Sequence, residues 1–130
     1  MRGMAVRRLL TQPAVLGLVW LLPCSPPVLA QSQYQGRAMA EWENDLVEPV
    51  PEVRRRAALA LAHFGAEAVP ALVQALDDQD FSVRAAASRA LGEIGPAASN
   101  ALPALVNAID DQNTAVREAA ARALEQIRGQ

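Results

Sequence analysis

Lysine is absent from this 130-residue chain, and cysteine, histidine and tyrosine each occur only once. The single cysteine, Cys24, lies in the first thirty residues, so the rest of the chain has no thiol for a disulfide, a zinc–cysteine site or thiol catalysis. A Ser-His-acid arrangement would need His63 with Ser82, Ser88 or Ser99, which lie on helical sequence without a strained nucleophile turn. No glycine-rich phosphate loop is present. These absences predict a protein that is not an enzyme and has no cofactor.

Acidic residues are absent from the first forty positions, and all fourteen lie further along the chain. Three of the twelve arginines lie in the first thirty residues, so the remainder has nine arginines and fourteen acids, a formal net charge of −5. Binding to nucleic acid needs a basic face that neutralises phosphates, so we expect no nucleic-acid partner. A remainder of about 100 residues makes one small domain.

The first thirty residues have the three parts of a secretory signal peptide. Arg2, Arg7 and Arg8 form a basic start, residues 14–22 form an apolar run, and small or β-branched residues precede Gln31. The apolar run is shorter than the about 20 residues of a spanning helix.

We therefore expect residues 1–30 to be removed on export to the periplasm or the exterior of a bacterial cell, which leaves no membrane attachment. Residues 31–34 are then expected to be a disordered N-terminus.

Other interpretations of the first thirty residues stay open. The segment could remain as an uncleaved membrane anchor. Leu21 to Cys24 resembles a lipoprotein box, although Pro23 stands where a small residue should precede the lipidated cysteine. Arg7-Arg8 is a twin-arginine pair without the rest of that export signal.

A segment in the second half of the chain occurs twice, and the two copies align without gaps. LDDQDFSVRAAASRALGEIG begins at Leu76 and IDDQNTAVREAAARALEQIR at Ile109, while a third copy, VRRRAALALAHFG, begins at Val53. Apolar residues recur at i, i+3, i+4, i+7, i+8 and i+11, which is one face of an α-helix. Most of them are alanine, so neighbouring helices can approach closely. Each such helix buries little area alone and needs neighbours on both sides.

A shorter helix is predicted ahead of each long one. VPALVQALD begins at Val69 and LPALVNAID at Leu102, each with a proline in the first turn, where no N–H partner is lost. The same register extends to residues 35–47, which we interpret as a degenerate first helix. Its apolar residues, aligned with Val69, Leu72 and Leu76, are Met39, Trp42 and Leu46.

The sequence therefore predicts an all-α fold of about three helix pairs over residues 35–128. Three pairs are near the minimum for a stacked array with a continuous core. The expected repeats span about 35–65, 66–95 and 96–128.

These units resemble HEAT-like repeats, especially the short variety found in phycobilin lyases and many bacterial HEAT-repeat proteins. The resemblance is carried by VPEVRRRAALALAHFG, QDFSVRAAASRALGEIG and QNTAVREAAARALEQIR, with VPALVQALDD-like helices before them. It implies a right-handed α-solenoid that acts as a protein-interaction scaffold. It also implies an alternative, an accessory role in chromophore or cofactor attachment. Deoxyhypusine hydroxylase, an enzymatic relative, holds di-iron with several His-Glu pairs that this chain lacks.

Clusters of acidic and amide side chains precede two of the long helices, DDQD at residues 77–80 and DDQN at residues 110–113. Asp80 and Asn113 stand at the N-cap position, where a side chain accepts hydrogen bonds from free backbone N–H groups. A calcium or magnesium site, with calcium-dependent adhesion as its function, is the rival interpretation. The clusters lack the alternating ligands and the glycine of an EF-hand loop, so we predict no metal.

The resemblance further implies that aspartates of these turns and arginines of the long helices form a ladder that joins successive repeats. The residues concerned are Asp78, Arg84, Asp111 and Arg117, with Arg54 in the equivalent place of the first repeat. Their pairing is left open by the sequence.

The outward side of the long helices is the candidate surface for a partner, by resemblance to the family's usual concave surface. The side chains expected there are Arg55, Leu59, His63, Arg89, Glu93 and Arg122, among the small residues Ala58, Ala62, Ala85, Ser88 and Gly92. His63 aligns with two polar residues of the other repeats, which places it at solvent or in a groove. We expect the partner to be another protein that contributes a helix or an acidic segment. The chain itself is expected to be a monomer or a stacking dimer.

Overall fold

The computed structural model describes residues 33–129, and the expected signal peptide at residues 1–30 lies outside them. The elements in chain order, with η for a 3-10 helix, are β1 (Gln33–Tyr34), β2 (Arg37–Ala38), α4 (Met39–Asp45), α5 (Pro51–Leu61), η2 (Ala62–Ala68), α6 (Val69–Ala75), α7 (Phe81–Ile94), η3 (Gly95–Ala101), α8 (Leu102–Ala108) and α9 (Thr114–Arg128). The expected all-α architecture of HEAT-like helix pairs is confirmed.

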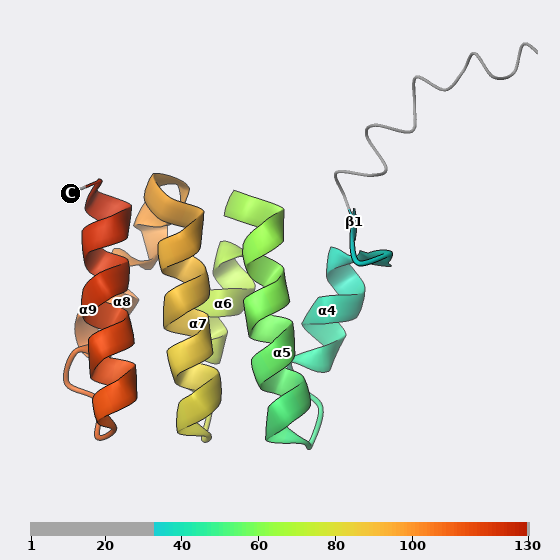
Figure 1. Ribbon diagram of the computed structural model, residues 1–130, viewed down its shortest axis with the longest axis horizontal. Coiled ribbons are helices and arrows are strands. Elements are labelled where there is room, and N and C mark those ends of the chain that lie inside the picture. Colours follow the sequence, from blue (N-terminus) through green and yellow to red (C-terminus); the bar gives the residue numbers. More distant parts are fainter. Residues whose placement is uncertain (1–32, 130) are drawn as a thin grey trace, which may run out of the picture. The chain divides into compact units, whose positions relative to one another are not determined.

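The repeat region has two layers of helices. The long helices α5, α7 and α9 stand side by side, with the short helices α6 and α8 behind them and α4 next to α5 (Figure 1). Helix α7 packs against both α5 and α9, and each short helix packs against the long helix that follows it. The core lies between the layers, and its largest fully buried side chains include Leu61, Leu72, Leu91 and Leu105.

The alanine-rich stripes let the long helices pack very closely. All six stripe residues of α9 are buried, and in α7 only Ile94 is partly exposed. One close approach is at Gly92 of α7, where an added Cβ would lie 3.0 Å from Cα of Ala123 in α9. A side chain at position 92 therefore fits only if Gln126 and α9 shift.

The N-terminal part of the repeat region differs from the expectation of a disordered segment at 31–34 and a helix from residue 35. Gln33 and Tyr34 form β1, which pairs antiparallel with β2, and only residues 31 and 32 of that segment lie outside the described part of the chain. The helix expectation is wrong because Gln35 and Gly36 have φ angles of 55° and 76°, outside the right-handed helical region. Helix α4 therefore begins only at Met39.

The register assigned to this first short helix nevertheless holds. Trp42 is 3% exposed in the core, and Met39 and Leu46 pack partly buried against it.

By length and composition alone the stretch Pro51–Ala75 could cross a membrane. Gly65, with φ 66° and ψ −142°, breaks that stretch, and much of it forms the repeat core, so we assign it to the core.

The turn carboxylates bind arginines of the preceding repeat. Arg54 of α5 forms a two-pronged ion pair with Asp78, at 2.8 Å from Nε and 3.0 Å from Nη2. Arg84 of α7 binds Asp111 in the same way, at 2.8 and 2.9 Å. Such bidentate pairs are short, charge-assisted and geometrically specific. The ladder therefore joins repeat one to two and repeat two to three.

The same carboxylates also shape the turns that hold them. Asp78 Oδ1 accepts the backbone N–H of Asp80 at 2.9 Å, and Asp111 Oδ1 accepts that of Asn113 at 2.9 Å. Asp80 and Asn113 are in turn the N-caps of α7 and α9, each accepting a backbone N–H of the first turn at 2.8 Å. The carboxylate clusters thus serve as caps and as inter-repeat pairs.

Acid should weaken the fold through two of these aspartates. The hydrogen bond from Arg84 holds the pKa of Asp111 below its usual range, and the Ser82 hydroxyl, followed by its backbone N–H, lowers the pKa of Asp80. A carboxyl whose pKa is lower in the folded state contributes stability above its ordinary pKa, near 4, and loses it as the pH falls through the folded-state pKa. The melting temperature should therefore change little from pH 7 to about 5 and fall below about 4.

Thermal unfolding followed by circular dichroism between pH 7 and 2.5 measures this. The variant Asp111→Asn should melt lower at pH 7 and show a shallower acid decline. A decline identical to that of the wild type would contradict the assignment to Asp111.

Candidate functional site

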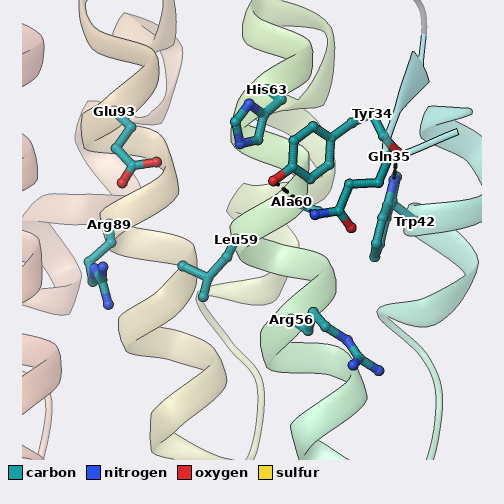
Figure 2. A pocket seen from close by; sticks show the side chains of 9 residues that line it. All are labelled: Tyr34, Gln35, Trp42, Arg56, Leu59, Ala60, His63, Arg89 and Glu93. Atoms are coloured by element: carbon teal, nitrogen blue, oxygen red, sulfur yellow. Dashed lines mark hydrogen bonds between the residues drawn. The ribbon is translucent and has the colours of Figure 1, made fainter. Parts of the chain in front are cut away.

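A pocket of about 290 Å³ opens on the long-helix side of the molecule, against β1, α4, α5 and α7. Figure 2 shows the side chains around it. They are Tyr34, Gln35, Trp42, Arg56, Leu59, Ala60, His63, Arg89 and Glu93. The pocket therefore spans the first and second repeats.

Stacked aromatic rings form one wall of the pocket. The rings of Tyr34 and His63 lie parallel within 11°, with centroids 3.8 Å apart. Trp42 Nε1 donates to the backbone oxygen of Tyr34 at 3.2 Å, and Gln35 Nε2 donates to the Tyr34 hydroxyl at 3.2 Å. Arg37 lies 4.0 Å from the centroid of the Trp42 ring, so a cation–π contact also fixes the hairpin on α4.

The structure brings together four of the six residues expected to bind a partner. Leu59, His63, Arg89 and Glu93 line the pocket. The other two are engaged elsewhere on the long-helix side. Arg55 forms an ion pair with Glu52, one turn earlier on α5, and Arg122 of α9 pairs with Glu118 at 3.7 Å.

Part of the expected small-residue surface is buried. Ala58 and Ser88 are fully buried and Gly92 is buried as well, so none of the three can contact a partner. The helices approach so closely that these positions lie between neighbouring helices, while Ala62 and Ala85 remain half-buried. The expectation for Ala58, Ser88 and Gly92 is therefore wrong.

Sequence reasoning missed five residues of the pocket, Tyr34, Gln35, Trp42, Arg56 and Ala60. The hairpin residues were hidden by the helix expected from residue 35. Arg56 did carry a signal, because it aligns with Ala86 and Ala119, which are 3% and 4% exposed. An arginine at a position that is otherwise buried alanine indicates that no long helix covers α5 on that side.

The pocket contains two arginines with no acidic partner. Among residues 33–129, five arginines form ion pairs with carboxylates, namely Arg37, Arg54, Arg55, Arg84 and Arg122. Arg56 and Arg89 form none within this range, and both line the pocket. Leu59 lies between them in Figure 2. Two guanidinium groups around an apolar contact can bind carboxylates of a peptide segment.

The pocket offers little for catalysis. Its only histidine, His63, stacks on Tyr34, and its one acid is Glu93. Within the described part of the chain, no three His, Cys, Asp or Glu side chains gather as metal ligands would. The arrangement is suited to binding by charge and by ring surfaces.

Comparison with known proteins bears on the whole repeat region. A family model for HEAT repeats matches residues 41–125. A search of curated proteins found no match. The match covers more than half of the chain and extends from the first short helix into the last long one. This chain therefore belongs to the HEAT-repeat family.

Proposed function

We propose that this protein is an exported, non-enzymatic interaction module of the cell envelope, and that its pocket between β1, α5 and α7 binds an acidic segment of another protein. The observation that carries the proposal is the position of Arg56 and Arg89. Both line the pocket, and neither has a carboxylate partner within residues 33–129, whereas five other arginines of that range have one.

Arg56 and Arg89 are two of four arginines among residues 33–129 that form no ion pair, and the other two, Arg117 and Arg128, lie outside the pocket. From residue 31 onward the chain has fourteen acids and nine arginines, so most basic groups are already neutralised by its own carboxylates. Guanidinium groups left without such a partner attract an incoming carboxylate and fix its orientation through their planar donors. Leu59 and the Tyr34–His63 stack supply apolar and ring surface beside the charges. An acidic segment with an apolar side chain between its carboxylates meets all of these groups.

Family and leader sequence support the remaining parts of the proposal. HEAT repeats generally mediate protein–protein interaction and are generally not enzymes. The match carries no indication of chromophore attachment. The basic start, short apolar run and small-residue exit of the first thirty residues support export with cleavage before Gln31.

The test is capture of partners from the host's envelope fraction with three tagged proteins, followed by cross-linking and mass spectrometry. We expect a dominant partner, cross-linked near α5 and α7, to be retained by the wild type and lost by Arg56→Glu/Arg89→Glu. The matched control, Arg122→Glu/Arg128→Glu, has the same charge change outside the pocket and should retain it. Equal retention by the two double variants would refute the pocket. Recovered bait that still begins before Gln31 would refute cleavage of the leader.

A further inference from the structure

The last repeat also has a ladder arginine, Arg117, but this arginine has no carboxylate partner among residues 33–129. The Nη1 group of each ladder arginine donates to two backbone carbonyls of the turn that precedes its helix. For Arg84, these carbonyls belong to Asp78 and Gln79, at 2.8 and 3.2 Å. Arg117 repeats this arrangement, with 2.8 Å to Asp111 and 3.1 Å to Gln112.

The other edge of Arg117 differs from that of Arg84. The Nε and Nη2 groups of Arg84 bind Asp111 of the next repeat, whereas Nη2 of Arg117 donates to Thr114 Oγ1 at 2.8 Å. No acid among residues 33–129 pairs with Arg117. Its guanidinium is therefore held in place by its own turn, on the side where the preceding arginines bind a carboxylate.

Two apolar side chains of α8 are exposed at the same end of the stack. Val106 and Ile109 are 48% and 37% exposed. Their equivalents in the second repeat, Val73 and Leu76, line the space between α6 and α8. Val73 is half-buried there, and Leu76 is only 6% exposed. Val106 and Ile109 therefore face away from α6, where no further short helix covers them within the described residues.

An acid accompanies them on this side of α8. Asp77 lines the α6–α8 space together with Val73 and Leu76, and its equivalent in the last repeat is Asp110, which is exposed. We call the surface formed by Val106, Ile109, Asp110 and Arg117 the end patch. It combines an apolar centre with one acid and one base that have no ionic partner within residues 33–129.

We propose that the end patch is the interface of a homodimer with a two-fold axis. Val106 and Ile109 of one copy pack on their counterparts, and Arg117 of each copy binds Asp110 of the other. A two-fold interface requires a surface that complements itself, and this patch carries both signs of charge around apolar side chains. Burial of the apolar centre supplies the driving force and the two ion pairs fix the orientation.

The opposite end of the stack does not suit a head-to-tail contact. The side of α6 that meets α4 is formed by Ala71, Gln74, Ala75 and Asp78. The equivalent positions of the first repeat, on α4 and the turn that follows it, are Glu41, Asn44, Asp45 and Glu48. Head-to-tail stacking would therefore cover Val106 and Ile109 with polar side chains. Two of these, Glu41 and Asp45, are paired with Arg37, although Glu48, at the ladder position, could receive Arg117. The patch pairs better with itself.

Sedimentation velocity over a range of protein concentrations, with reversal of the two charges, tests the dimer. The wild type should show a monomer–dimer equilibrium. Arg117→Glu alone and Asp110→Arg alone should each raise the dissociation constant about thirtyfold, because the two-fold axis makes every substitution act twice. The double variant Asp110→Arg/Arg117→Glu should restore dimerisation, since each pair is then rebuilt with its charges exchanged.

The double variant also separates association from folding. It lacks the backbone hydrogen bonds of Arg117, as the single variant does, so a mere folding defect would persist in it. Arg122→Glu makes the same charge change elsewhere on α9 and should dimerise like the wild type. A wild type that stays monomeric at all concentrations would overturn the proposal, as would a double variant no better than Arg117→Glu.

Discussion

Replacing Gly92 with leucine should destabilise the fold by about 3 kcal/mol and lower its melting temperature by roughly 12–24 °C. An added Cβ would lie 3.0 Å from Cα and 3.2 Å from Cβ of Ala123, and it would overlap the Gln126 side chain. Gln126 can swing away, but the rest of the leucine side chain fits only if α9 moves well away from α7. The loss exceeds the gain of about 1 kcal/mol that leucine brings over glycine in a helix.

Thermal and urea unfolding of three variants measure this effect. Gly92→Ala should change stability much less than Gly92→Leu does. Its Cβ meets Cα of Ala123 at 3.0 Å, which a small shift of α9 relieves, and the higher helix propensity of alanine offsets the cost of that shift. Glu125→Leu places the same side chain at the equivalent position of the last long helix, which is exposed, and should change stability by less than about 0.5 kcal/mol. A Gly92→Leu protein as stable as the wild type would show that α7 and α9 do not pack this closely.

Repetition explains why so much of the fold could be predicted from the sequence. The gapless alignment of the second and third repeats pairs Val83 with Val116 and Asp80 with Asn113, so each position occurs twice in the same pattern. The helical period then identified the buried stripe, and the N-caps follow from short polar side chains just before it. A residue such as Trp42, in a degenerate copy, could still be placed in the core by register alone.

The parts of the fold that were predicted wrongly are mainly those whose sequence has no second copy in another repeat. The turn at Gln35 and Gly36 is unique to the first repeat, and β1 and β2 have only two residues each, too short for an alternating pattern to show. The burial of Ala58 and Ser88 was missed because a small side chain fits both an outward face and a helix–helix contact. Which carboxylate each arginine binds depends on the stacking geometry, which the sequence does not encode locally.

Breaking the ladder pair between the second and third repeats should cost more than breaking any of the exposed ion pairs of the described residues. Arg84→Met keeps the apolar stem but removes both hydrogen bonds to Asp111, whose side chain is only 14% exposed. A carboxylate left without its partner in such a place costs more than the pair contributes, because it cannot recover its hydration. We expect a loss of about 3 kcal/mol, measured by urea unfolding at pH 7.

A double-mutant cycle separates the stranded carboxylate from the other effects. Asp111→Asn can still accept the backbone N–H of Asn113, so Arg84→Met/Asp111→Asn should be less destabilised than the sum of the two single changes, by about 1–2 kcal/mol. Arg117→Met is the matched control, because Arg117 makes the same two backbone contacts but strands no carboxylate of a following repeat. Measured at a concentration where the protein is monomeric, it should cost about 1 kcal/mol. Equal losses for Arg84→Met and Arg117→Met would mean that the backbone contacts, and not the inter-repeat ion pair, hold the repeats in register.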